Sequence, residues 1–347
     1  MRKIILILIL LIGKLAFTQE KLYYFYTSDS TLVGVKNEKG KIIIPAQFSG
    51  FRIYDTENPI NEPTIEFWGA SFKNKKYDKD NPRIEAGEVY DRNGKFLYYP
   101  QWFDNGNDIW EEGLRRYVEK NKMGFVDWFG KKVLPAKWDF ATQFNYGYAI
   151  VYTGGWKREF DKGGEHWFIA PISKKSTSYL INKKGIKVKP LKKSNNPKDY
   201  LYEGKYYPYP FVYNNIEQKI VDKINQLEIL TEINHPFDKK IINHYEIVNR
   251  PNKYLPYYEL KNFYGQEKYN SPNNSLWVNK KGEIFYKNYD YKFIPLKEYI
   301  RKILERIIED QKRGYKTKDY PINAEKVLRS EERRVGKECR SRWSPYH

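Results

Sequence analysis

The chain has 347 residues, enough to bury a hydrophobic core in one repeat array or two domains. Its 62 Lys and Arg residues outnumber 43 Asp and Glu residues, which gives a formal net charge of +19. This balance favours anionic partners such as acidic glycans, lipopolysaccharide or a membrane surface, and it identifies none of them. Cys339 is the single cysteine, so an intrachain disulfide is excluded.

The N-terminus has the features of a secretory signal peptide. A basic start at Met1 to Lys3 precedes a short apolar run from Ile4 to Ile12, and Ala16 to Thr18 supplies small residues for cleavage before Gln19. We predict residues 1–18 to be a signal peptide and the protein to be exported, to the periplasm, the cell surface or the medium. An uncleaved anchor is the alternative. The run is too short to span a bilayer comfortably, so no stable membrane span is expected after cleavage.

An Asp or Asn stands three residues ahead of a Gly five times between short apolar runs. The Asx side chain can bond the backbone of the turn that it opens, and Gly takes the left-handed conformation that closes a type I turn with a bulge. In three copies a Pro follows at a near-fixed distance, where we expect it to block extension of the strand ladder. The predicted structural positions of these hairpins are Asn37, Gly40, Pro45, Asp91, Gly94, Asp127, Gly130, Pro135, Asn182, Gly185, Pro190, Asn279 and Gly282.

Short runs of Tyr, Phe, Trp, Val and Ile, separated by Gly, Pro and Asn, are typical of strands. They predict a mainly β fold of stacked antiparallel hairpin or meander repeats over residues 19–190. The segments 54–63 and 73–82 are expected to be surface loops. The lysine-rich segment 183–198 is interpreted as an exposed linker.

Residues 191–328 are predicted to form a smaller α+β region. Apolar residues at three- and four-residue spacing indicate a helix from Asn215 to about Leu230. A second helix is predicted to begin with Pro295 in its first turn and to end near Gly314. Its apolar stripe favours packing on the protein's own sheet, and a helix that lies on a membrane or binds a partner is the alternative.

The C-terminal segment resembles the conceptual translation of a sequencing-library adapter. We interpret Arg329 to His347 as an assembly artefact and expect the native sequence to differ after Leu328. No function is assigned to the residues of this segment.

The segment from Gly124 to Val151 resembles a unit of the WG-repeat family of bacterial proteins. It carries in register the family's Gly, hydrophobic pair, Asp, turn Gly, Pro, aromatic-Asp pair, Ala, Phe and Gly-x-Ala-x-Val. Gly34 to Phe48 repeats the first half of this unit. Shorter fragments keep only the turn, at residues 89–94, 180–185 and, as a degenerate repeat, 277–286.

The name-giving Trp-Gly pair of the family is replaced by Met123-Gly124 in the best unit and by Val33-Gly34 in the first. The resemblance implies a β-rich repeat protein, often exported, whose role is commonly taken as interaction. The family has no general catalytic residue to carry over.

No catalytic, cofactor-binding or metal-binding residue is predicted. Three histidines precede the C-terminal segment, and none has a metal partner at a familiar spacing; they are His166, His235 and His244. The segment from Asp104 to Asp108, with Glu111 and Glu112, does not match the calcium-loop pattern and is interpreted as an acidic surface loop. Motifs for a Ser nucleophile are also missing.

Two functions are compatible with these features. The first is an exported, non-enzymatic interaction or envelope-associated scaffold that binds a protein, a peptide or an anionic glycan, and not nucleic acid. The second is a hydrolase acting on carbohydrate or peptidoglycan through the C-terminal region. Tyrosines mixed with lysines at 202–209 and 286–291 would suit glycans or peptides if exposed, or they could pave ordinary strands.

Overall fold

The computed structural model describes residues 20–49, 53–69, 87–103, 106–163, 167–234, 243–265, 268–270, 275–288, 292–314 and 322–329. The predicted signal peptide at 1–18, the predicted loop at 73–82 and the C-terminal segment from 330 onward lie outside these ranges.

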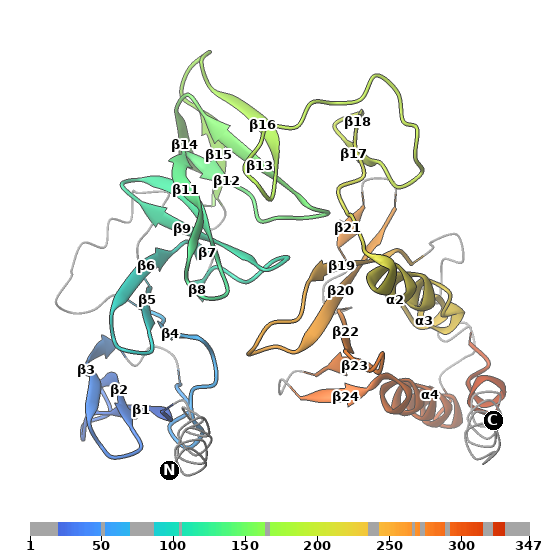
Figure 1. The fold of residues 1–347 in the computed structure, drawn as a ribbon, viewed down its shortest axis with the longest axis horizontal. Helices are drawn as coiled ribbons and strands as arrows, with labels where there is room; N and C mark the ends of the chain where they lie inside the picture. The colour runs from blue at the N-terminus through green and yellow to red at the C-terminus, as the bar shows by residue number, and fades with distance from the viewer. Residues whose placement is uncertain are drawn as a thin grey trace, which may run out of the picture. The chain divides into compact units, whose positions relative to one another are not determined.

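The described chain is mainly β, with antiparallel strand pairs and helices towards the C-terminal end, which confirms the predicted fold class (Figure 1). It divides into two compact units. The first comprises Met1–Trp110, Leu114–Ala141 and Tyr152–Thr177, and the second comprises Glu111–Gly113, Thr142–Val151 and Ser178–His347. The second unit therefore includes two short segments that come from within the predicted repeat region.

The first unit contains the strongest repeats. A three-stranded sheet has the order β1-β2-β3, with β1 (Leu22–Tyr26), β2 (Leu32–Asn37) and β3 (Ile42–Ser49). A six-stranded sheet has the order β11-β10-β9-β6-β5-β4, with β4 (Thr64–Phe67), β5 (Glu88–Asp91), β6 (Phe96–Pro100), β9 (Leu114–Glu119), β10 (Lys122–Asp127) and β11 (Lys132–Trp138). The first unit also contains two separate two-stranded hairpins: β7 (Trp102–Phe103) with β8 (Gly106–Asn107), and β14 (Trp156–Phe160) with β15 (Trp167–Pro171).

A further sheet has the order β12-β13-β16, with β12 (Phe140–Ala141), β13 (Tyr148–Thr153) and β16 (Thr177–Asn182). In the second unit, β17 (Tyr200–Tyr202) pairs with β18 (Lys205–Tyr207). A larger sheet has the order β19-β20-β22-β23-β24, with β21 (Tyr269–Asn270) paired to β20; its strands are β19 (Tyr245–Asn249), β20 (Tyr257–Tyr264), β22 (Leu276–Asn279), β23 (Ile284–Lys287) and β24 (Phe293–Pro295).

Glycine and proline meet across a bulge in the two best repeats. Gly34 in β2 and Gly124 in β10 each lie at a register shift, across from the unpaired segments 45–47 of β3 and 135–137 of β11, which begin with Pro45 and Pro135. A Cβ atom on Gly34 would lie 2.8 Å from the carbonyl carbon of Pro45, so only Gly fits this approach. The two prolines therefore lie inside strands, at bulges where their missing N–H is tolerated. Both β3 and β11 are edge strands of their described sheets, so each Pro lies in a strand beyond which the ladder does not extend.

Aromatic packing fills the core of the first unit. The rings of Phe48 in β3 and Phe67 in β4 stack with centroids 3.7 Å apart, and Tyr90 of β5 contacts both edge-on. All three are at least nine-tenths buried. This cluster joins residues of the two larger sheets of the unit into one core.

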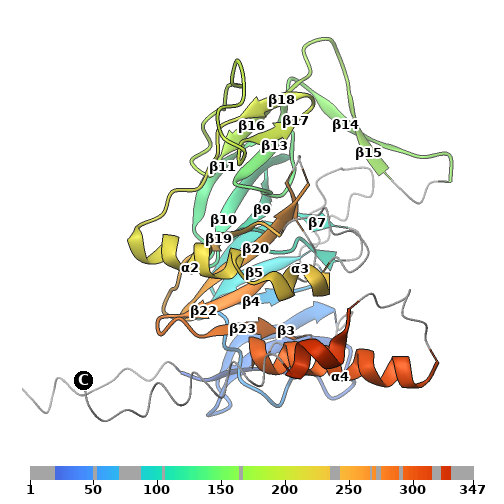
Figure 2. The same cartoon turned by 90° about the vertical axis from the view of Figure 1, so that its right-hand side faces the viewer.

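In the second unit, helices pack on one sheet. Helices α2 (Asn215–Asn225) and α4 (Leu296–Lys312) contribute their apolar faces to a core shared with strands of the β19–β24 sheet, and α3 (Glu228–Asn234) follows α2 (Figures 1 and 2). The first predicted helix is thus divided, because Gln226 caps α2 before α3 begins. Pro295 is the N-cap residue of α4, one position before the predicted first turn.

No helix among the described residues is long and apolar enough to cross a membrane.

Candidate functional site

The five predicted repeat turns share one backbone geometry. In each, the Asx carbonyl accepts a hydrogen bond from the Gly amide three residues later, at 2.8–3.1 Å. The Asx Oδ1 atom accepts two more, from the amides two and four residues later, at 2.8–3.1 Å. The Gly φ angles lie between +73° and +81°, where L side chains are strained. The pairs are Asn37 with Gly40, Asp91 with Gly94, Asp127 with Gly130, Asn182 with Gly185, and Asn279 with Gly282.

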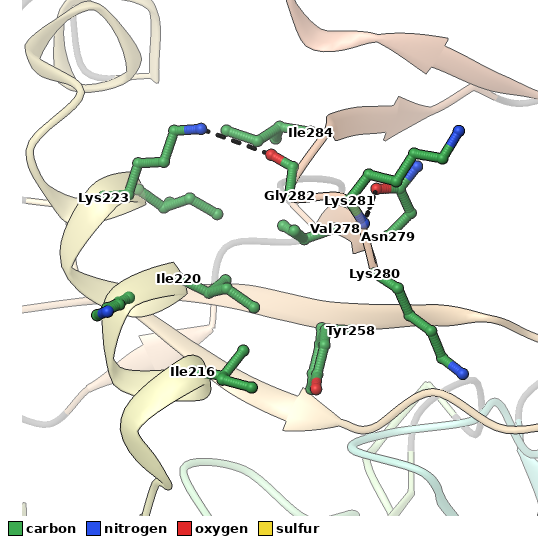
Figure 3. A pocket seen from close by; sticks show the side chains of 12 residues that line it. Ile216, Ile220, Lys223, Tyr258, Val278, Asn279, Lys280, Lys281, Gly282 and Ile284 are labelled. Carbon is green, nitrogen blue, oxygen red and sulfur yellow. Dashed lines mark hydrogen bonds between the residues drawn. The ribbon is translucent and has the colours of Figure 1, made fainter. Parts of the chain in front are cut away.

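The turn at Asn279 and Gly282 borders a groove in the second unit. The groove has a volume of about 550 Å³, which is within the range of small-ligand sites. Helix α2 forms one wall, and the strands β20, β22 and β23 form the other (Figure 3). We call it the α2 groove; it is lined by Ile216, Lys219, Ile220, Lys223, Ile224, Tyr258, Val278, Asn279, Lys280, Lys281, Gly282 and Ile284.

The floor of the α2 groove is apolar because α2 is amphipathic. Ile220 and Ile224 lie one turn apart on the face of α2 that meets Val278 of β22. Ile224 and Val278 are almost fully buried, whereas Ile216, one turn towards the N-terminus, is 67% exposed. The apolar stripe of α2 therefore continues beyond the part that the sheet covers.

The rim of the groove is basic on both sides. Lys219 and Lys223 lie one turn apart on α2. Lys280 and Lys281 occupy the centre of the repeat turn between β22 and β23 (Figure 3). All four side chains are exposed. The Lys223 Nζ donates to the Gly282 carbonyl across the groove at 3.5 Å. The lining residues include no acid, so the rim presents four positive charges that no lining side chain neutralises.

A capping box fixes the start of α2 and so positions the groove wall. The Asn214 side chain accepts from the amides of Ile216 and Glu217, and the Glu217 carboxylate accepts from the Asn214 amide. Arg250 donates to both carboxylate oxygens of Glu217, at 2.7 and 3.1 Å. These hydrogen bonds, led by that from Arg250, hold the pKa of Glu217 below its ordinary value against the opposing effect of burial.

The chemistry of the lining favours binding over bond cleavage. Its titratable side chains are four lysines and Tyr258, with no carboxylate or imidazole to serve as a general acid–base pair near neutral pH. Ammonium groups attract carboxylates, phosphates or sulfates, and the apolar floor favours burial of alkyl or aromatic groups. The groove is therefore suited to a ligand that combines negative charge with an apolar face.

A second cluster of titratable groups surrounds Glu246 of β19, whose side chain is fully buried. His244 lies two residues earlier on the same strand face and contacts Glu246 through Nε2. The hydroxyls of Tyr209, at 2.6 Å, and Tyr213 both donate to the carboxylate. Burial disfavours the charged carboxylate, but the contacts from His244 and the two tyrosines outweigh it and keep the pKa of Glu246 below its ordinary value.

Each described member of the segment interpreted as an acidic loop is paired with a cation. Asp108 accepts from Arg116 at 2.6 Å, Glu111 pairs with Lys261, and Glu112 lies 3.1 Å from Lys183. Asp108 and Glu112 are buried, so they anchor backbone segments and do not form a surface loop. Asp104, His166 and His235 lie outside the described residues.

The aromatic segment at 202–209 is only partly packed into the protein, because Tyr207 is its one buried residue. Tyr207 is 9% exposed and belongs to a core cluster with Tyr146, Tyr148 and Tyr200. Tyr286 of the second aromatic segment stacks on a ring of α4, and residues 289–291 lie outside the described residues. Tyr202 and Tyr206 lie in the paired strands β17 and β18, and Tyr206 is 39% exposed, so the first segment contributes to strand surface as well as to core.

Sequence reasoning did not identify the α2 groove. The pair Lys219 and Lys223 at helical spacing was a readable local signal, as was the Lys280-Lys281 dipeptide in a predicted turn. The two lysine pairs lie on opposite sides of an apolar floor because distant strands pair and α2 packs on them. Local sequence patterns do not specify these contacts.

Comparison with known proteins identifies the repeats. The model of the WG containing repeat matches residues 34–58 and 123–155, which confirms the resemblance. Both matches include the Gly–Pro bulge described above. No curated protein and no solved structure matches the chain.

Proposed function

We propose that this WG-repeat protein is an exported, non-catalytic interaction protein that binds an anionic partner through the α2 groove. The repeat match and the β-rich fold support a role as a scaffold. The observation that carries the proposal is the set of four exposed lysines around an apolar floor with no acid in the lining. The excess of basic over acidic residues in the whole chain is consistent with such a partner.

A direct test measures the affinity of the purified protein for a fluorescein-labelled hexaglutamate peptide by fluorescence anisotropy. The groove variant replaces Lys219, Lys223, Lys280 and Lys281 with Gln. A control variant replaces four exposed lysines that flank repeat turns in the first unit and loses the same charge: Lys39, Lys41, Lys95 and Lys131.

We expect about a tenfold weaker affinity for the groove variant, corresponding to about 1.4 kcal/mol, and less than about a twofold change for the control. Equal losses in both variants would show that only the net charge matters, and would contradict a binding site at the α2 groove.

Export is a separate part of the proposal and rests on the pattern of residues 1–18. Fractionation of cells that express the full chain with an internal epitope tag tests it. Tagged protein found only in the cytoplasm would contradict export, and shortening by about two kilodaltons would support cleavage.

The alternative of a carbohydrate- or peptidoglycan-acting hydrolase would need two carboxylates within reach of one glycosidic bond. The groove lining supplies none. Release of soluble sugar from cell-wall or glycan substrates by the purified protein would favour the hydrolase over the proposed scaffold.

A further inference from the structure

The positive charges of the α2 groove are arranged on two banks. Lys219 and Lys223 belong to the helix, and Lys280 and Lys281 belong to the turn. Ile220 and Val278 lie between the helix and the turn (Figure 3). A ligand with a single charged head would place its charge at one end of an apolar body. The groove instead favours a ligand that carries negative charge along both sides of an apolar strip.

The apolar strip also extends along α2. Ile216 is 67% exposed and Val212, just before the helix, is 82% exposed, whereas Ile224 at the other end is buried. The uncovered apolar surface thus runs from the groove towards the N-terminal end of α2. Exposed apolar side chains beside a charged rim are characteristic of interaction sites.

Strand addition is disfavoured at the floor. Strand β22 is paired on one side with β20 and on the other with β23, and β23 is paired with β22 and β24. The backbone donors and acceptors of these strands are therefore already engaged with their neighbours. A partner segment must bind through side chains and must satisfy its own backbone hydrogen bonds, which a helix does.

Resting on the proposed function, we propose that the occupant of the α2 groove is an acidic amphipathic helix of a partner protein. Its apolar residues, at spacings of three and four, lie on Ile216, Ile220 and Ile284, whose side chains are exposed or partly exposed. Its Asp and Glu side chains flank this stripe on both sides and face the two lysine banks. One carboxylate replaces the Gly282 carbonyl as the acceptor for Lys223, which opens the contact that now crosses the groove.

The experiment compares three synthetic peptides of equal length by isothermal titration against the purified protein. The first has apolar residues at i, i+3, i+4 and i+7 with Glu on both flanks. The second has the same composition in an order that destroys the periodicity. The third keeps the apolar pattern and replaces every Glu with Lys. We expect the first peptide to bind about tenfold more tightly than the second and the third not to bind measurably.

Two variants make the test specific to the groove. Ile216→Ser removes an exposed apolar contact that the fold does not need, and should weaken binding of the first peptide by at least about fivefold. The double variant Lys219→Glu/Lys223→Glu should lose the first peptide and gain the Lys-bearing third peptide. Circular dichroism of each variant confirms that it is folded.

The outcomes separate this inference from the proposed function. The first and second peptides could bind with equal affinity, and both affinities could depend on the groove lysines. That result would overturn the helix inference but would still support an anionic partner. No binding of any acidic peptide would overturn both. Binding of a monomeric long-chain carboxylate, measured by the same titration without binding of any peptide, would identify a lipid ligand and also overturn the inference.

Discussion

The clearest single-residue feature is the ionised group buried at Glu246. A fully buried carboxylate is costly unless it is hydrogen-bonded, and here two tyrosine hydroxyls and His244 contact it. Lys198 Nζ also lies 3.7 Å from one of its oxygens. The Tyr213 hydroxyl in turn accepts from the Ile247 amide at 3.1 Å. The cluster therefore ties the segment before α2 to β19.

Replacing Glu246 with Ala should lower the free energy of unfolding by about 3 kcal/mol, because it leaves several buried polar groups without their shared partner. Tyr213→Phe removes one donor and should cost about 1–2 kcal/mol. Urea unfolding followed by circular dichroism measures both. An Ala variant as stable as the wild type would show that the cluster does not stabilise the fold.

The pH dependence of this cluster has a defined sign. The folded-state pKa of Glu246 lies below its ordinary value of 4.5, so the carboxylate contributes stability above that value and loses it as the pH falls through the folded-state pKa. Between pH 7 and 3 the wild type should therefore lose more stability than Glu246→Gln. A Gln variant with the same acid dependence as the wild type would rule out Glu246 as a source of that loss.

At the scale of elements, the repeat depends on one close approach between strands. A Cβ atom on Gly124 would lie 2.5 Å from the Leu134 carbonyl oxygen and 2.7 Å from the Ala136 amide nitrogen. Gly34 has the same surroundings, with the Ile44 oxygen and the Ala46 nitrogen at 2.6 Å. These contacts are backbone atoms that cannot move aside singly. They explain in physical terms why a Gly stands at this position of the repeat.

Gly124→Ala should accordingly lower the free energy of unfolding by about 3 kcal/mol, which is the upper end of the usual cost of adding a group to a closely packed site. Gly163→Ala is the control, because its new Cβ would lie 3.6 Å from its nearest neighbour and its backbone conformation is ordinary; this change should be close to neutral. Denaturant midpoints measure both. Similar midpoints for the two variants would contradict the close-approach explanation.

The sequence predicted the elements better than their contacts. Asx-x-x-Gly turns depend on four adjacent residues, so their positions could be read directly, and the stripe of α4 was equally local. The role of Pro45 could not be read, because the bulge that accommodates it is defined by Gly34 on another strand. Glu246 and the α2 groove likewise depend on segments that are distant in the chain.

At the scale of the whole molecule, net charge and local charge act on different steps of binding. The formal charge of +19 creates a positive field, which would steer an acidic partner of the proposed kind during its approach. In the proposed complex, the four groove lysines act on the bound partner at contact distance. Salt screens the first effect strongly, since the Debye length is about 8 Å at physiological ionic strength.

This difference predicts how two variants of equal charge will separate in kinetics. Both the groove variant and the control with Lys39, Lys41, Lys95 and Lys131 changed to Gln lose four positive charges, so the association rate for the patterned acidic peptide should fall similarly in both at low salt. Only from the groove variant should the peptide dissociate about tenfold faster.

Raising the salt from about 0.01 to 0.15 M should slow association of the peptide with the wild type by about tenfold. Stopped-flow fluorescence gives both rates. A faster dissociation in the control would mean that the partner contacts the first unit, because long-range steering alone does not change how long a bound peptide stays.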